Sequence, residues 1–176
     1  MENTKIFHEV KDFTYTRPGK LFITSIIDDV DTLKQLLPKD DGENKLIKDA
    51  FDKNMNDFSN LINKYINKTN LLGNGFPYIS NNKNYCNIRA YYLSNGTAVS
   101  LCIDEPHNYT CVIFLDDGGD NNNFNFYPGE KQENNACYSI PIKKGTFMLF
   151  PSWLFYGTNT ITNKVQIIIF NMNIYP

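Results

Sequence analysis

The sequence predicts a mainly β domain of the α+β class, in which about seven short strands form a sandwich or barrel-like roll and one long helix packs outside. Three observations lead to this fold class. Short apolar runs with turn sequences between them fill the second half, and a stretch of helical periodicity lies in the first half. The length of 176 residues suits one domain. We therefore expect a single domain over residues 1–176, with N-terminal strands and helices at 1–80 and the β core at 81–176.

The N-terminal region predicts two outer strands and a short helix. Residues 5–16 partly alternate between apolar and polar side chains and stop at Arg17-Pro18-Gly19, which is a turn sequence. A second apolar run covers residues 21–27, so the two segments are expected to form a hairpin or two outer strands. Asp31 or Thr32 can cap a short helix that Pro38 ends.

One long amphipathic helix is predicted over residues 43–66. Its apolar positions recur at intervals of four and three, with Lys, Asp and Asn between them: Ile47, Phe51, Met55, Phe58, Ile62 and Tyr65. Such a stripe can bind a partner helix or a membrane surface, but it is more often the face that a helix lays on a sheet. We expect the sheet.

Beyond Tyr85 the sequence has the character of β structure throughout. The predicted strands are 85–93, 97–103, 109–115, 123–127, 136–142, 146–150 and 165–174. Turn sequences such as Ser94-Asn95-Gly96 and Pro128-Gly129 separate them. We expect the apolar stretch 145–157 and the run 164–174 to pair with each other, because both are bounded, apolar and rich in β-branched or aromatic residues.

Composition excludes several classes of function. The net charge of −2, with acids and bases mixed, offers no basic face for nucleic acid. No signal sequence is visible at the start, and no stretch approaches the roughly 18 apolar residues of a membrane span. We expect a cytoplasmic or virion protein. The abundant Asn, Lys and Ile resemble the coding bias of an AT-rich genome, which hints at a virus, a phage or an AT-rich microbe.

The cysteines and the acidic loop give no strong motif. Four cysteines spaced 16, 9 and 26 residues apart match no zinc pattern, so we expect free thiols. A nucleophilic pair would need Cys102 or Cys137 with His8 or His107, and nothing selects one. Residues 116–123 look like a calcium loop but lack the ligand spacing of an EF-hand, so a solvated hairpin tip is the preferred interpretation.

The stretch Phe150-Pro151-Ser152-Trp153-Leu154, followed by the final β run, resembles the Fe(II)- and 2-oxoglutarate-dependent oxygenases, and most of all a hydroxylase-like branch of bacteria and phages. The resemblance covers residues 85–174 and implies a double-stranded β-helix, or jelly roll. The family motif is a His-x-Asp or His-x-His before a strand, then a His shortly after Phe-Pro-Ser-Trp-Leu, then an Arg on the last strand that holds the cosubstrate carboxylate. Two imidazoles and a carboxylate bind one face of the iron.

Carried onto this sequence, the first pair falls on Cys102 and Asp104, and the later histidine falls on Tyr156. The cosubstrate position falls on Lys164 or Val165. Only the carboxylate of the iron ligands is kept, so the resemblance implies a degenerate site with no catalytic residues and no metal ligands.

The chain has two histidines, His8 and His107, and no His, Asp or Glu after Glu133. We therefore expect that the usual iron site does not form, that no cofactor is used, and that Phe155 and Tyr156 fill the pocket. An improvised cluster of Asp104, His107 and Cys102 is the alternative metal site. The preferred interpretation is that His107 is a turn or surface residue next to Pro106.

The leading functional hypothesis is a catalytically degenerate oxygenase-like jelly roll that acts as a structural or binding module. A phage virion or another assembly is the expected setting, with protein partners or a homo-oligomer. The first rival is an active Fe(II)/2-oxoglutarate-dependent dioxygenase with a non-standard site around Asp104. The second is a roll that binds a sugar or another ligand with its aromatic side chains.

Overall fold

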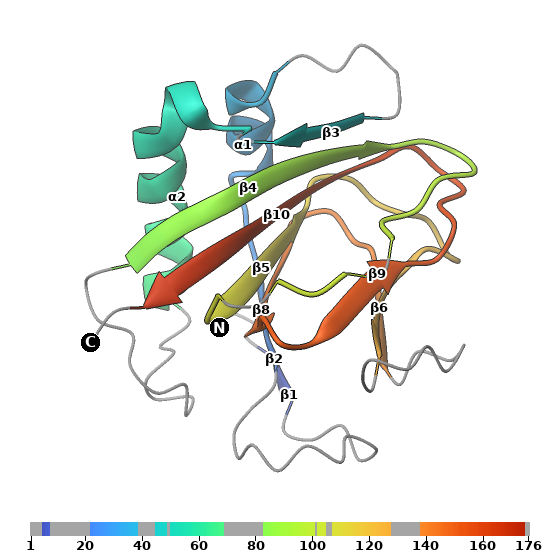
Figure 1. Ribbon diagram of the computed structural model, residues 1–176. Helices are drawn as coiled ribbons and strands as arrows, with labels where there is room; N and C mark the ends of the chain where they lie inside the picture. The colour runs from blue at the N-terminus through green and yellow to red at the C-terminus, as the bar shows by residue number, and fades with distance from the viewer. Residues whose placement is uncertain are drawn as a thin grey trace.

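The computed structural model describes residues 5–7, 22–38, 45–48, 50–68, 83–100, 102–104, 107–127 and 138–174. These residues form helices and two antiparallel sheets (Figure 1). The large sheet has the strand order β1-β2-β8-β5-β10-β4-β3, and the small sheet has the order β7-β6-β9. The elements are β1 (Lys5–Phe7), β2 (Phe22–Ile26), α1 (Val30–Leu36), β3 (Lys45–Lys48), the 3-10 turn η1 (Asp52–Asn54), α2 (Met55–Lys68), β4 (Lys83–Leu93), β5 (Tyr109–Phe114), β6 (Asn123–Tyr127), β7 (Tyr138–Pro141), β8 (Thr146–Pro151), β9 (Phe155–Thr158) and β10 (Val165–Ile174).

The central strands of the large sheet are buried on both faces. Alternate residues of a strand point to opposite sides, so β5, β8 and β10 supply side chains to two separate cores. Phe58, Tyr65 and Phe170 belong to the core between this sheet and the helices. Phe124 and Tyr156 belong to the core between the two sheets. Burial on both faces explains why the central strands are almost continuously apolar.

The predicted fold class is confirmed: the structure is mainly β, with two sheets, a helix packed outside and N-terminal strands that join the large sheet. β1 and β2 form the expected antiparallel pair, and β2 also pairs with β8. The short helix is present as α1. Neither described helix has the length and hydropathy that a membrane crossing requires.

The long helix is shorter than predicted. α2 begins at Met55 rather than at residue 43, because Lys45–Lys48 form the edge strand β3 against β4. The Ala50 N–H then donates to the Ile88 carbonyl. Ile47 and Phe51 contact the same core as the helix although they lie outside it. The apolar periodicity therefore continued through a strand and a turn.

The predicted pairing of the stretch 145–157 with the run 164–174 is wrong. β5 lies between β8 and β10 and pairs with both of them. All three strands are apolar on both faces, so hydrophobic pattern carries no information about which one is the neighbour.

Two strand assignments also change. The stretch 145–157 holds two strands, β8 and β9, separated by a turn in which the Leu154 N–H donates to the Pro151 carbonyl. Residues 97–103 are not a strand in the described structure; Cys102 forms only an isolated bridge with Tyr156. Cys86, Cys102 and Cys111 are free, as predicted, and Cys137 lies outside the described residues.

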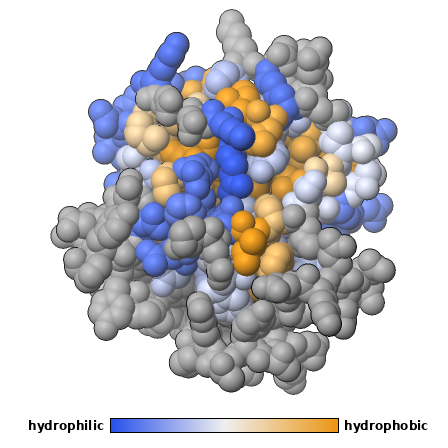
Figure 2. Space-filling model, viewed as in Figure 1, coloured by the Kyte–Doolittle hydropathy of each residue, from blue (hydrophilic) through white to orange (hydrophobic). Residues whose placement is uncertain are grey.

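Few large apolar side chains of the described residues reach the surface. Ile26 and Leu46 are the most exposed of them, at 53% and 45%. Figure 2 shows hydrophilic side chains over much of one face, with apolar groups between them. The apolar residues of the chain are therefore used mainly in the two cores.

Replacing Phe58 by Ala is expected to destabilise the fold by about 3–5 kcal/mol, the usual cost of removing a buried phenyl ring. Phe58 is fully buried, stacks on Phe51 at 4.4 Å and meets Phe170 edge-on at 5.2 Å. Urea unfolding measures the change in the free energy of unfolding. Leu46→Ala, on the exposed edge strand, is the control and should cost under about 1 kcal/mol; equal effects of the two changes would contradict the described helix core.

Candidate functional site

A buried carboxylate, Asp104, lies between the two sheets and accepts hydrogen bonds from three side chains. Arg89 Nη2 lies 2.8 Å from Oδ1 and 2.9 Å from Oδ2. The Tyr156 hydroxyl donates to Oδ2 at 2.6 Å, and the Thr110 hydroxyl donates to the same oxygen at 3.0 Å. We call these four residues the Asp104 network.

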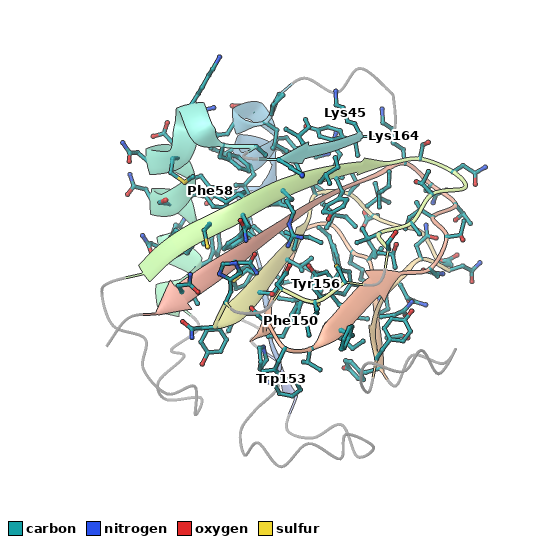
Figure 3. The ribbon with its side chains drawn as sticks, viewed as in Figure 1. Lys45, Phe58, Phe150, Trp153, Tyr156 and Lys164 are labelled. Atoms are coloured by element: carbon teal, nitrogen blue, oxygen red, sulfur yellow. The ribbon has the colours of Figure 1, made fainter. Side chains whose placement is uncertain are left out.

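Each member is placed by backbone pairing. Arg89 lies on β4 opposite Ile169 of β10, on the face that points to the small sheet. Tyr156 lies on β9, where its N–H donates to the Cys102 carbonyl at 3.0 Å and its carbonyl accepts from the Cys102 N–H at 2.9 Å. This bridge holds Tyr156 opposite Cys102, which precedes Asp104 by two residues in the sequence. Figure 3 shows Tyr156 and Phe150 pointing into the space between the sheets.

The Tyr156 ring is fully buried and packed on both sides. It stacks on Phe124 with ring centres 5.4 Å apart and meets Phe150 edge-on at 5.4 Å. Large aromatic side chains therefore occupy the region beside the carboxylate, in agreement with the expectation that Tyr156 fills this part of the roll. Phe155, the other expected plug, is only half-buried.

The polar region continues from Thr110 towards the end of β10. Thr110 Oγ1 lies 2.9 Å from Ser152 Oγ, and Asn171 Nδ2 donates to Thr110 Oγ1 at 3.2 Å. Two buried atoms have no hydrogen-bond partner among the described residues: Arg89 Nε and Asn171 Oδ1. A buried polar atom without a partner is unfavourable, so these two atoms mark where this interior is least satisfied.

The network carries one positive and one negative charge. Burial opposes the charged form of Arg89, but Tyr156 and the Asp104 carboxylate outweigh that effect and raise the pKa of the guanidinium. Burial also raises the pKa of the Tyr156 phenol well above its ordinary value. The phenol therefore stays protonated and donates a hydrogen bond to Asp104. Burial raises the pKa of the Cys102 thiol as well.

The structure brings together Cys102, Asp104 and Tyr156, the three positions onto which the family ligands fall. Lys164 and Val165 lie elsewhere. Val165 pairs with Leu93, four residues along β10 from the partner of Arg89, which is a separation of about 13 Å in a strand.

Sequence reasoning missed Arg89, the cation of the site. The available signal was its setting: it is one of two arginines in the sequence and stands within the apolar strand sequence 85–93. A cation in a strand buried on both faces requires an anionic partner.

The donor set does not fit an iron site of the family type. No group of three or more His, Cys, Asp or Glu side chains within the described part of the chain is placed to hold a metal ion. Both Asp104 oxygens already accept hydrogen bonds, and the groups at the two imidazole positions are a thiol and a phenol. Protonated thiols and phenols are poor ligands compared with neutral imidazole.

The alternative cluster of Asp104, His107 and Cys102 is not assembled. The His107 N–H donates to the backbone carbonyl of Asp104, but its imidazole contacts Cys86, Asn87 and Asn173.

The acidic loop has structural roles. Asp116 forms an ion pair with Lys34 and accepts the Gln166 N–H, and Asp117 accepts the Lys144 N–H. These contacts hold the loop against α1 and the start of β10, in agreement with the preferred interpretation as a hairpin tip.

No family model and no curated protein matches the sequence. Solved structures do match the fold at low sequence identity. The viral collagen prolyl hydroxylase vCPH of Paramecium Bursaria Chlorella virus-1, in complex with 2-oxoglutarate, matches with a TM-score of 0.61 and 13% identity over 90% of this chain and 98% of that chain. HygX from Streptomyces hygroscopicus, with nickel and 2-oxoglutarate bound, gives 0.59 and 10% over 86% and 82%. The carbocyclase SnoK from nogalamycin biosynthesis gives 0.60 and 11% over 86% and 79%. The chain therefore has the fold of the 2-oxoglutarate/Fe(II) oxygenases.

These neighbours overturn the expectation that no cofactor is used. They are oxygenases of the 2-oxoglutarate/Fe(II) type, and structures with 2-oxoglutarate and with nickel are among them. The expectation rested on the missing imidazoles and left out Arg89, whose guanidinium belongs to the class of groups that bind carboxylates.

Changing Arg89 to Met is expected to destabilise the protein by about 3–5 kcal/mol, because the Asp104 carboxylate is left buried without its cation. Adding Asp104→Asn should recover a large part of that loss, since the uncompensated charge is gone. Chemical denaturation of the two single variants and the double variant gives the coupling free energy. The exposed pair Lys144–Asp31 serves as the control, with a coupling under about 0.5 kcal/mol. Additive effects at Arg89 and Asp104 would contradict the buried ion pair.

Proposed function

We propose that this chain is a binding module built on the oxygenase fold, and that it does not carry out oxygenase turnover at Asp104. The observation that supports this is the occupation of both Asp104 oxygens by N–H and O–H donors. In an iron facial triad those lone pairs, together with two imidazole nitrogens, would face the metal. Here the donors Arg89, Tyr156 and Thr110 face the carboxylate instead.

The charge balance supports the same proposal. A buried carboxylate needs a cation nearby, and in a metal site the metal supplies it. Arg89 supplies it here through an amino group that contacts both oxygens, with the side chains of Arg89 and Asp104 exposed by only 18% and 7%. Arg89 thus gives the carboxylate a stable environment that depends on the chain's own residues alone.

The binding role we propose is with a protein partner. The large sheet ends in β3, a four-residue edge strand that pairs only on its β4 side among the described elements. Leu46, in the middle of this edge, is 45% exposed. A sheet edge can pair with another chain and Leu46 adds an apolar contact, although a strand of this length with a lysine at each end has features that natural proteins use to limit such pairing. We propose that the partner chain belongs to an assembly, such as a virion or a homo-oligomer of this chain.

Turnover can be tested directly. The purified chain is incubated with Fe(II) and 2-oxoglutarate under oxygen, and succinate is quantified. We expect no succinate above a control without protein, because the site lacks the imidazole ligands. Succinate formation that requires Asp104 would support the rival, a dioxygenase with a non-standard site, and would end the proposal. Thermal shift with 2-oxoglutarate alone tests cosubstrate binding separately, and binding without succinate is compatible with a module.

Restoring the family ligands is the converse experiment. The triple change Cys102→His, Tyr156→His and Arg89→Met removes the competing cation and provides two imidazoles beside Asp104. Co(II) titration followed by visible absorption should show binding at least about tenfold tighter than in the unchanged chain, since two neutral imidazoles and a carboxylate are then available. The matched control adds Asp104→Ala to the triple variant and should lose the gain. A gain that persists without Asp104 would place the metal elsewhere.

A further inference from the structure

A second polar cluster lies between β4, β10 and the segment that leads into β5. Cys86 Sγ is 3.7 Å from His107 Nδ1. His107 Nε2 is 2.7 Å from the Asn87 amide, and its Nδ1 is 3.2 Å from Asn173 Nδ2. Cys86, His107 and Asn173 are half-buried, and Asn87 is exposed, so the cluster lies at the surface end of the polar interior.

A backbone irregularity places Cys86 in this cluster. The register between β4 and β10 shifts so that Arg89 pairs with Ile169 and Cys86 pairs with Asn171. Asn87, inside the shift, has a φ of 49°, which is a left-handed conformation that a residue other than glycine adopts only at a cost. In a regular strand, alternation from Arg89 would turn Cys86 towards the helix layer. The bulge turns it to the other face, where His107 lies.

The contacts of His107 show what the transfer of a proton from Cys86 requires. Asn173 presents both amide atoms to Nδ1, with Oδ1 at 3.3 Å and Nδ2 at 3.2 Å, and the same Nδ2 lies 3.7 Å from Cys86 Sγ. The Asn87 amide nitrogen lies 2.7 Å from Nε2. For Nδ1 to take the thiol proton, the ring proton must lie on Nε2, and the Asn87 amide must turn so that Oδ1 accepts it, a rotation that exchanges its O and N positions.

We propose that Cys86 and His107 form a nucleophile–base pair, oriented by Asn87, and that Cys86 is a site of covalent modification by carbon electrophiles. A thiol and a base within hydrogen-bond reach, with a third group that fixes the base, is the arrangement that activates a nucleophile. In the reaction the Sγ proton passes to His107 Nδ1 as the Sγ–C bond forms. The bond from carbon to the leaving group breaks, the leaving group departs with its electron pair, and His107 then releases the proton.

The environment of the thiol makes the base necessary. Burial, and the charge of Asp104, raise the pKa of the Cys86 thiol, so it keeps its proton at neutral pH. The titratable groups that face it among the described residues are His107 and Asp104, and Asp104 is engaged by Arg89. Cys102 provides an internal comparison, because it is also half-buried with a raised pKa but has Tyr156 rather than an imidazole as its hydrogen-bond partner.

The test is the rate of alkylation by iodoacetamide at pH 7.5, measured at each cysteine by peptide mass spectrometry. Cys86 should react faster than Cys102 and Cys111. His107→Gln should slow Cys86 by about tenfold or more, since a positioned base contributes at least that much. Asn87→Gly should slow it several-fold while keeping the bulge, because glycine adopts positive φ without strain. The rate at Cys102 is the control in each variant, and the thermal unfolding midpoint checks the fold.

Two results would overturn the proposal: a Cys86 rate no higher than that of Cys102 in the unchanged chain, or a Cys86 rate that His107→Gln leaves unaltered. Neither result bears on the Asp104 carboxylate, because the Cys86–His107 pair touches Asp104 through the backbone, where the His107 N–H donates to the Asp104 carbonyl, and not through the side chains that bind the carboxylate. The failure of this inference and the failure of the proposed function are therefore distinguishable.

Discussion

The interior between the sheets depends on the ion pair of Arg89 and Asp104. An isolated carboxylate in an apolar interior is strongly unfavourable, and two sheets cannot close over one unless a cation closes with it. Arg89 reaches the carboxylate from β4, while Thr110 and Tyr156 reach it from β5 and β9. The two sheets are thus joined by this polar contact and by the aromatic and aliphatic side chains of the core between them. Tyr156 takes part in both, because its ring stacks on Phe124 while its hydroxyl binds Asp104.

The large sheet makes this arrangement possible because each central strand serves two cores. Residues such as Phe170 face the helices, and their neighbours, such as Ile169, face the small sheet. The helix layer fixes the sheet from one side, so the other side can include polar residues without losing its shape. A fold with one core would have fewer apolar contacts to offset the buried ion pair and the unpartnered Arg89 Nε.

The sequence allowed prediction of the parts that local pattern determines. Most strand positions from Tyr109 to Ile174, the N-terminal pair and the helical face of Phe58 follow from periodicity and turn sequences, but the short strand β9 was not predicted. The order of the strands in the sheet could not be predicted, because β5, β8 and β10 are all apolar on both faces and any order would bury them. The family resemblance located Cys102, Asp104 and Tyr156, yet it contained no counterpart for Arg89. Nor does local pattern reveal the bulge at Asn87, which exists only through pairing with β10.

The two polar clusters follow from one property of β10 and β4. Beyond Ile169 the inward positions of β10 change from apolar to polar, at Asn171 and Asn173, and the bulge in β4 keeps Cys86 facing them. Buried amides and a thiol on inward positions would be unfavourable unless each found a partner. Thr110 meets Asn171 and His107 meets Asn173, so most polar groups at this end of the roll have a partner, with Asn171 Oδ1 as the exception among the described residues. The interior closes around Asp104 because Arg89 balances the charge of the carboxylate, and Tyr156 and Thr110 donate hydrogen bonds to it.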